Sequence, residues 1–193
     1  PYRIAGVLWY QGESNTSNYK DYVALQAAMV ANWRKDFGVG EFPFYFVQIA
    51  PYVYGNSKAI NSALQRDEQF KSVSQISNSG MASTIDIGEE KNIHPAEKLV
   101  VAKRLALWAF AETYGIKGIK YKSPAFSKMV VKDTLAVLSF DNVASGLSTF
   151  GKEVNCFEIA GPDSIFYPAK LAIKAKQANV WSPKVKTPVA VRY

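Results

Sequence analysis

Short apolar segments alternate with longer amphipathic segments over the first part of the chain. The apolar segments cover residues 4–10, 42–50 and 81–87, and segments with helical spacing cover residues 19–37, 59–77 and 96–114. A continuous apolar run is typical of a strand that is buried on both faces, as in a parallel sheet. The order strand then helix, three times over, therefore predicts an α/β fold with parallel strands and right-handed crossovers. The helix at 96–114 is apolar nearly all round, so we expect it to be largely buried.

After Gly115 the pattern changes to short strands separated by turns. The strand candidates are residues 129–131, 134–140, 157–160, 169–173 and 189–191. Several of them alternate between apolar and polar residues, which is typical of an all-β sandwich. We therefore predict an α/β domain at residues 1–116 and a small β-sandwich domain at residues 117–193.

The chain contains one cysteine, Cys156, and one histidine, His94. An internal disulfide, a cysteine zinc cluster and a multi-histidine metal site are therefore excluded. Any catalysis that needs an imidazole must use His94.

The net charge of +7 is unevenly distributed. Residues 1–116 hold 11 Lys and Arg against 11 Asp and Glu, whereas residues 117–193 hold 12 against 5. The basic residues of the second part are scattered singly, which favours solubility over nucleic-acid binding. We therefore expect no nucleic-acid partner. No apolar stretch approaches the roughly 18 residues of a membrane span, so we also expect no membrane insertion.

The chain opens almost directly inside an apolar strand, at Pro1, without an initiator Met. We therefore expect it to be part of a longer polypeptide. An exposed strand such as residues 4–10 is prone to pair with other chains. We therefore expect one of three outcomes: association with the rest of the polypeptide, self-association, or burial of the exposed faces by rearrangement.

Polar residues gather in the loops that follow the three predicted strands, at residues 11–18, 51–58 and 88–95. Ligands of open α/β sheets bind beyond the carboxyl ends of the strands. His94 lies in the third of these loops, just before a predicted buried helix. A neutral imidazole can accept a proton from a serine hydroxyl and return it later.

A carboxylate would be needed to orient that ring, and Asp86, Glu89 and Glu90 are all near it in sequence. The first loop offers Gln11, whose amide could donate to an oxyanion. The alternative is that Gln11 and Glu13 only bond the loop backbone. We take His94, Gln11, Glu13 and Asp86 as the candidate catalytic residues.

Two blocks of residues resemble the sialate O-acetylesterase family of SGNH-type carbohydrate esterases. They are Trp9-Tyr10-Gln11-Gly12-Glu13-Ser14-Asn15 and Asn92-Ile93-His94-Pro95, and further similarity lies at residues 44–51, 83–88, 102–107, 138–142, 157–161 and 189–193. The resemblance covers most of the chain. It implies that the α/β domain is the C-terminal part of an SGNH-type hydrolase, with a partial SGNH/flavodoxin-like, three-layer parallel sheet.

In that family a serine in a Gly-Gln-Ser-Asn turn, upstream of the first block, attacks an acetyl ester. The resemblance thus implies that the nucleophile is absent from this chain, that Gln11 lies on the oxyanion side and that His94 is the general base. Ser14 lies in a Gly-Glu-Ser-Asn turn, a likeness to the nucleophile turn that we regard as coincidental, because the loop is also a helix N-cap region. The family's commoner Asp three residues before the histidine is Lys91 here, which leaves the triad acid open.

The resemblance implies hydrolysis of acetyl esters on sialic acid or on a polysaccharide such as xylan, without metal or organic cofactor, by a periplasmic or secreted protein. The isolated chain is expected to be nearly inactive. A second interpretation is a non-catalytic carbohydrate-binding module, in which Phe166, Tyr167 and Trp181 would present aromatic faces to sugar rings; the alternative is that these aromatics belong to the core.

Overall fold

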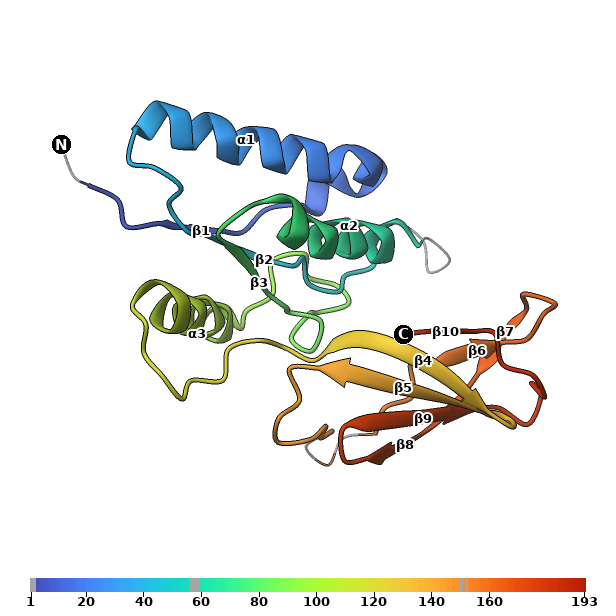
Figure 1. Cartoon of the computed structure of the whole chain (residues 1–193). Helices are drawn as coiled ribbons and strands as arrows, with labels where there is room; N and C mark the ends of the chain where they lie inside the picture. Colours follow the sequence, from blue (N-terminus) through green and yellow to red (C-terminus); the bar gives the residue numbers. More distant parts are fainter. Residues whose placement is uncertain (1–2, 56–59, 150, 152) are drawn as a thin grey trace. The chain divides into compact units, whose positions relative to one another are not determined.

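The chain forms two compact units, Pro1–Lys122 and Ser123–Tyr193, each with its own sheets (Figure 1). The computed structural model describes residues 3–55, 60–149, 151 and 153–193. The first unit mixes helices with a parallel sheet, and the second consists of antiparallel strands. The sequence analysis placed the boundary between them at 116/117.

The first unit alternates strands and helices in the predicted order. Its elements are β1 (Val7–Trp9), the 3-10 turns η1 (Glu13–Ser17) and η2 (Tyr19–Asp21), α1 (Tyr22–Phe37), β2 (Phe44–Val47), α2 (Asn61–Gln75), β3 (Ser79–Ala82), α3 (Lys98–Trp108) and the π-helical turn η3 (Ala109–Thr113). The strands form a sheet in the order β1-β2-β3, and both pairs are parallel, with Val7 opposite Phe44 and Phe44 opposite Ser79. The alternation and the parallel pairing are therefore confirmed.

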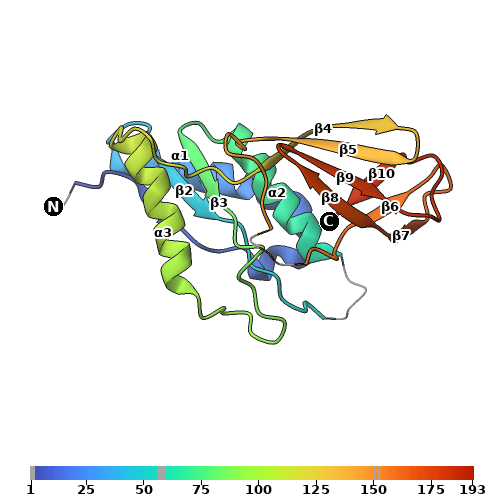
Figure 2. The same ribbon diagram turned by 90° about the horizontal axis from the view of Figure 1, so that it is seen from below.

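Helices cover both faces of this sheet, with α1 and α2 on one side and α3 on the other (Figures 1 and 2). The central strand β2 explains this arrangement, because all four of its residues are buried. Phe44 and Phe46 pack with Val30 and Ile76, whereas Tyr45 and Val47 pack with α3 residues. The apolar run of β2 thus supplies one core on each face.

Two burial predictions are wrong, one for strand β1 and one for helix α3. Strand β1 was expected to be buried on both faces, but Leu8 is 55% exposed because β1 lies at the sheet edge and α3 packs against β2 and β3. Helix α3 was expected to be largely buried, but Leu99 is 66% exposed and Phe110, in η3, is 43% exposed. The third strand also begins earlier than predicted, at Ser79, and residues 84–87 form a turn.

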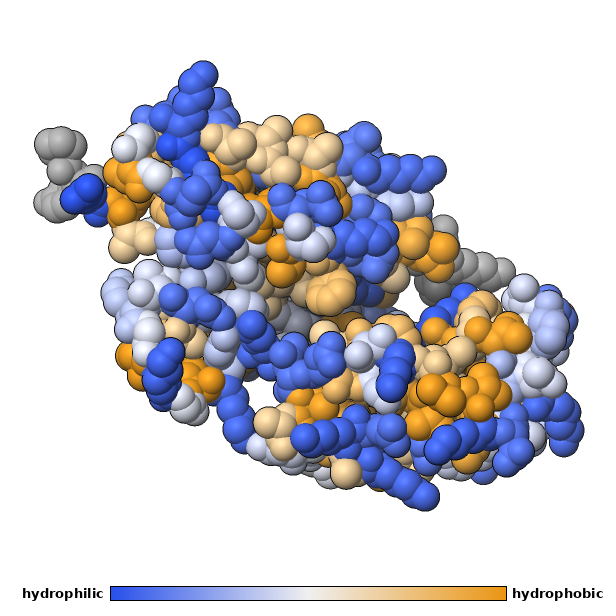
Figure 3. Space-filling model, viewed as in Figure 1, coloured by the Kyte–Doolittle hydropathy of each residue, from blue (hydrophilic) through white to orange (hydrophobic). Residues whose placement is uncertain are grey.

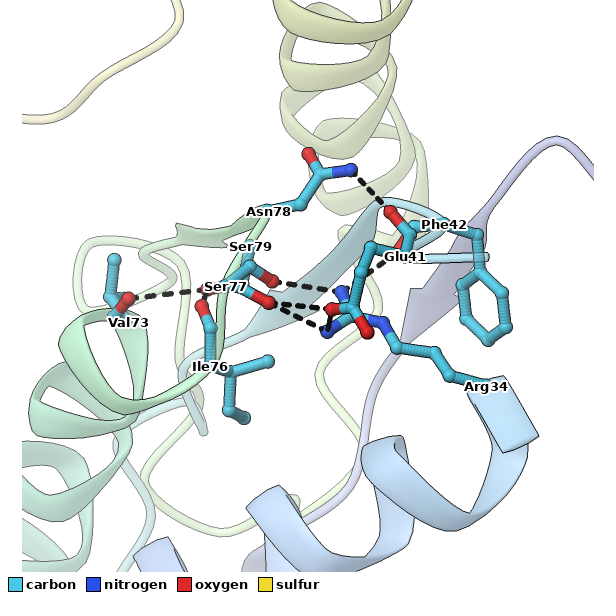
Figure 4. Close-up of polar contacts among 8 residues, drawn as sticks. All are labelled: Arg34, Glu41, Phe42, Val73, Ile76, Ser77, Asn78 and Ser79. Atoms are coloured by element: carbon cyan, nitrogen blue, oxygen red, sulfur yellow. Dashed lines mark hydrogen bonds and ion pairs between the residues drawn. The ribbon is translucent and has the colours of Figure 1, made fainter. Parts of the chain in front are cut away.

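A buried arginine joins the segments that enter β2 and β3 to the end of α1 (Figure 4). The Arg34 guanidinium donates to Glu41 Oε2 at 2.6 Å, to the Phe42 carbonyl at 2.8 Å and to the Ser77 carbonyl at 2.8 Å. The Asn78 amide donates to the Glu41 carbonyl at 2.7 Å. Charge-assisted bonds of this kind fix the amino-terminal edge of the sheet, which is the edge opposite to the predicted site.

The second unit contains two antiparallel sheets that share a core. Its strands are β4 (Ala125–Lys132), β5 (Leu135–Asp141), β6 (Glu158–Ala160), β7 (Phe166–Pro168), β8 (Lys170–Lys174), β9 (Gln177–Trp181) and β10 (Ala190–Arg192). The sheet orders are β4-β5-β9-β8 and β10-β6-β7. Leu138 and Val180 of the first sheet pack with Ile159 of the second. The five predicted strands are present, and the sequence analysis missed β7 and β9.

Strand β4 lies at an open edge and exposes apolar side chains. Phe126, Val130 and Val131 are all more than one third exposed, and Figure 3 shows apolar surface over this part of the unit beside hydrophilic surface. Lys128 and Lys132 on the same strand are of the residue type that discourages edge pairing. Self-association therefore stays a prediction.

Candidate active site

The loops that follow β1, β2 and β3 meet at the carboxyl edge of the parallel sheet. The Val53 amide, after β2, donates to the Glu90 carbonyl, after β3, at 3.2 Å. Gly88 lies so close to Pro51 that a Cβ at residue 88 would stand 2.4 Å from the Pro51 carbonyl oxygen. The predicted clustering of these loops at one edge agrees with this geometry.

A fully buried glutamine on α2 ties the ends of β1 and β2 together. Gln69 Nε2 lies within hydrogen-bond distance of the Gln11 carbonyl (3.2 Å), the Val47 carbonyl (3.3 Å) and the Tyr22 hydroxyl (3.4 Å). Gln69 Oε1 accepts from the Ile49 amide at 2.8 Å. The Tyr22 hydroxyl donates to the Gln11 carbonyl at 3.0 Å. These bonds hold the backbone of Gln11 against the rest of the sheet edge.

The hydrogen bonds of Gln69 require a glycine at the position after Gln11. Gly12 has φ 150°, which L side chains rarely adopt. A Cβ there would stand 2.8 Å from Gln69 Nε2 and 2.9 Å from the Ile49 side chain. Gly12 in the first block is therefore required by its backbone conformation and by its close approach to Gln69 and Ile49.

The Gln11 side chain is half-buried and points its amide at a neighbouring side chain. Gln11 Nε2 donates to Asn15 Oδ1 at 2.7 Å. A primary amide carries two N–H groups, so this bond leaves one donor. The alternative, in which the Gln11 side chain only bonds loop backbone, does not match this contact.

The loop that carries His94 is held by the side chains around it. The His94 main-chain N–H donates to Asn92 Oδ1 at 3.0 Å, and the Ala96 N–H donates to Glu89 Oε1 at 2.6 Å. Asn92 Nδ2 donates to Glu89 Oε2 at 3.3 Å, and Pro95 is buried. The His94 residue itself is exposed, and no side chain within the described ranges bonds its ring. A fixed backbone thus presents an accessible imidazole.

The three candidate acids have other roles in the described structure. Both oxygens of Asp86 accept from Arg104, at 2.7 and 2.6 Å, and Arg104 also donates to the Ser83 carbonyl. The hydrogen bond to Asp86 raises the pKa of Arg104. Glu89 holds the loop, and Glu90 is exposed. Asp86, one of the three acids considered for orienting the His94 ring, thus pairs with Arg104.

Glu13 is half-buried beside three tyrosines. Burial raises the pKa of Tyr10, Tyr22 and Tyr54, and the negative charge of Glu13 raises each further. Glu13 therefore lies at the predicted edge, where it helps to keep these hydroxyls protonated. Ser14, on the adjoining 3-10 turn, is exposed.

The sequence analysis missed Gln69, Tyr22 and Arg104. Helix α2 buries three polar residues, Gln65, Gln69 and Ser72, whose spacing of four and three places them on one face. A polar stripe at helical spacing on a helix that must pack against a sheet is the signal that could have revealed Gln69. No comparable signal marks Arg104, because its bond to Asp86 depends on the turn at residues 84–87.

Among the described residues, no group of three or more His, Cys, Asp and Glu side chains could hold a metal ion. None of the helices in those residues is long and apolar enough to span a bilayer.

A parallel α/β unit whose polar loops follow the strands at the carboxyl edge of its sheet belongs to the class of α/β proteins that bind ligands at that edge. Comparison with known proteins identifies the family. The family model described as carbohydrate esterase, sialic acid-specific acetylesterase, matches residues 2–106. The chain belongs to this family.

Among its relatives, the sialate O-acetylesterase of Rattus norvegicus is 34% identical over 157 residues, which cover 72% of this chain and 29% of that protein. The sialate O-acetylesterase of Mus musculus is 32% identical over 157 residues, which cover 72% of this chain and 29% of that protein. A crystal structure of a carbohydrate acetylesterase from Xanthomonas citri matches with a TM-score of 0.90 and 38% identity, over 100% of this chain and 45% of that one. The chain therefore spans less than half the length of each of these relatives.

Proposed function

We propose that this chain carries part of the active site of an esterase that removes acetyl groups from sialic acid or a related glycan. His94 is the general base and general acid, Gln11 donates to the oxyanion, and the nucleophile is a serine outside residues 1–193. The observation that carries the proposal is the exposed His94 imidazole on a braced loop, at the same sheet edge as the Gln11 amide.

The chemistry follows the serine–histidine pattern. His94 accepts the proton of the serine hydroxyl as its oxygen attacks the acetyl carbonyl. The second N–H of Gln11, with backbone N–H groups, donates to the oxyanion that forms. His94 then returns the proton to the sugar oxygen, which leaves as an alcohol. Water, deprotonated by His94, attacks the acetyl-serine carbonyl, and His94 returns this proton to the serine oxygen as acetate is released.

Three observations support an external nucleophile. Ser14 is exposed on a 3-10 turn, rather than on the tight strand-to-helix turn that presents a nucleophile. More than half of the length of each relative lies outside the matched region. Leu8 is exposed at the open edge of β1, where a further strand could pair. The finer fold proposal is an SGNH-type three-layer domain for the first unit and a β-sandwich for the second.

Substitution of His94 in an acetylesterase-active form of the protein tests this proposal. We expect His94→Gln to lower kcat/KM for O-acetylated sialic acid by about a thousandfold or more, and Gln11→Ala by about a hundredfold. Ser14→Ala is the matched control and should retain activity. Turnover by residues 1–193 alone that is abolished by Ser14→Ala would overturn the external-nucleophile proposal.

A second candidate function is carbohydrate binding by the second unit. A hollow of about 810 Å³ has Trp181, Lys170 and Asn155 among its lining residues. An indole face with polar neighbours can stack on a sugar ring and bond its hydroxyls. Glycan-array binding that is lost in Trp181→Ala would favour this function. Export to the periplasm or the cell exterior stays a prediction from the family.

A further inference from the structure

Arg66 is a partly buried cation for which the described residues supply no counter-ion. It lies on α2, and its main-chain carbonyl accepts from Gln48 Nε2 at 3.1 Å, which ties it to the end of β2. Its guanidinium takes part in no ion pair or hydrogen bond with the described residues, and Nη1 is enclosed without a partner. An enclosed guanidinium N–H without an acceptor is costly, so it indicates a binding partner.

The surroundings of Arg66 belong to the carboxyl edge of the sheet. The Tyr54 hydroxyl, in the loop after β2, is likewise enclosed and unpartnered. The Tyr10 hydroxyl, at the end of β1, is enclosed beside the Ala50 backbone. Burial lowers the pKa of Arg66, and the electrostatic interaction with Tyr54 opposes that effect. A cation and a hydroxyl without partners, Arg66 and Tyr54, thus lie near each other at this edge.

Glu13 is the carboxylate that interacts electrostatically with Tyr54, and it forms no ion pair with Arg66 among the described residues. Burial raises the pKa of both Tyr10 and Tyr54, and the charge of Glu13 raises it further. The Arg66 guanidinium therefore has no acceptor among the described residues.

We propose that Arg66 binds a carboxylate, with Tyr54 as a second donor, and that this carboxylate belongs to the sugar whose acetyl group is removed. The inference rests on the proposed function and deepens it. A guanidinium matches a carboxylate through two parallel N–H···O bonds, and a tyrosine hydroxyl can add a third. Sialic acid carries a carboxylate on its ring, whereas xylan backbone sugars do not. Arg66 thus selects an acidic sugar over a neutral one.

A carboxylate side chain from another segment of the protein has the same chemistry, so the test must separate the two sources. The probes are O-acetylated N-acetylneuraminic acid and its carboxyl methyl ester, which keep the same acetyl group and differ in one charge. The variants are Arg66→Met and Arg66→Lys. Lys71→Met is the matched control, because it removes an exposed cation from the same helix.

In an acetylesterase-active form of the protein, we expect the wild type to prefer the acid to its methyl ester in kcat/KM. Arg66→Met should lower this ratio about tenfold or more, mainly through KM, and Arg66→Lys should lower it less. Lys71→Met should keep the wild-type ratio. Equal losses for acid and ester in Arg66→Met, or no preference in the wild type, would overturn the inference in favour of a structural counter-ion.

Binding to residues 1–193 gives a second readout that needs no turnover. In saturation-transfer NMR, N-acetylneuraminic acid should give a signal with the wild type. We expect no comparable signal from the acid with Arg66→Met, or from the methyl ester with the wild type. Absence of acetyl release from every substrate would contradict the proposed function. The NMR binding measurement would then test the role of Arg66 by itself. A signal of equal strength from the acid and from its methyl ester would contradict the role of Arg66.

Discussion

The buried amide of Gln69 donates to the main-chain carbonyl of Gln11, 3.2 Å away, across 58 residues of sequence. The residue proposed to stabilise the oxyanion is therefore held by a side chain that is itself enclosed in the core. Because Gln69 Oε1 also accepts from the Ile49 amide, one side chain aligns the ends of two neighbouring strands.

This relationship predicts the effect of Gln69→Leu. The variant leaves the Ile49 N–H without its acceptor in a dry environment, so we expect the free energy of unfolding to fall by about 2 kcal/mol. Urea denaturation measures the change. Gln75→Leu, at an exposed position of the same helix, is the control and should change stability by less than about 0.5 kcal/mol. Equal effects of the two variants would show that the hydrogen bonds of Gln69 contribute little to the free energy of unfolding.

Tyr22 gives the first unit a stability that decreases at alkaline pH. Burial raises the pKa of its hydroxyl above the ordinary value of 10.0, and the hydrogen bond with Gln69 opposes this in part. The unfolded chain then loses the proton at lower pH than the folded one. The contribution is fully present below about pH 10 and is lost as pH rises further. Tyr22→Phe should make this decline shallower, and a decline as steep as in the wild type would contradict the argument.

Glu89 is predicted to act on catalysis through the position of His94. Its carboxylate accepts from the Ala96 N–H and from Asn92, so Glu89→Ala frees the loop at two points. We expect a loss in kcat of about tenfold in an acetylesterase-active form of the protein, with partial rescue by Glu89→Gln, which keeps an acceptor oxygen. Glu90→Ala, one residue along and exposed, is the matched control. A loss in Glu90→Ala as large as in Glu89→Ala would contradict this role.

Asp86 is predicted to contribute to the turn before the histidine loop rather than to proton transfer. Its partner is Arg104, and Asp86 is 55% exposed, so Asp86→Asn should lower the free energy of unfolding by less than about 1 kcal/mol. Its effect on kcat/KM should be far smaller than that of His94→Gln. Comparable losses in the two variants would identify Asp86 as the triad acid after all.

Gly88 is predicted to control the contact between two of the site loops. A Cβ there would meet Pro51 backbone atoms at 2.4 and 2.7 Å, so Gly88→Ala should destabilise the first unit by about 1–3 kcal/mol. Hydrogen exchange at the Val53 amide, which bonds Glu90, should become faster, while the amide of Phe46 in β2 should keep its protection. Unchanged exchange at Val53 would mean that the loops do not depend on this close approach.

The sequence alone determined the order of strands and helices, the buried character of β2 and the loops in which Gln11 and His94 lie. These features follow from local periodicity and from chain order, because an uninterrupted apolar run and a helical repeat each report on a segment by itself. The family resemblance rested on blocks of adjacent residues and needed no fold to be seen.

Only the tertiary structure decided which faces are covered and which side chains meet. Leu8 is as apolar as its neighbours in β1, yet it is exposed because β1 lies at the edge and α3 packs elsewhere. Asp86 pairs with Arg104, and Gln69 with Gln11, since hydrogen bonds between distant segments depend on how the elements pack, and periodicity carries no information about such pairs.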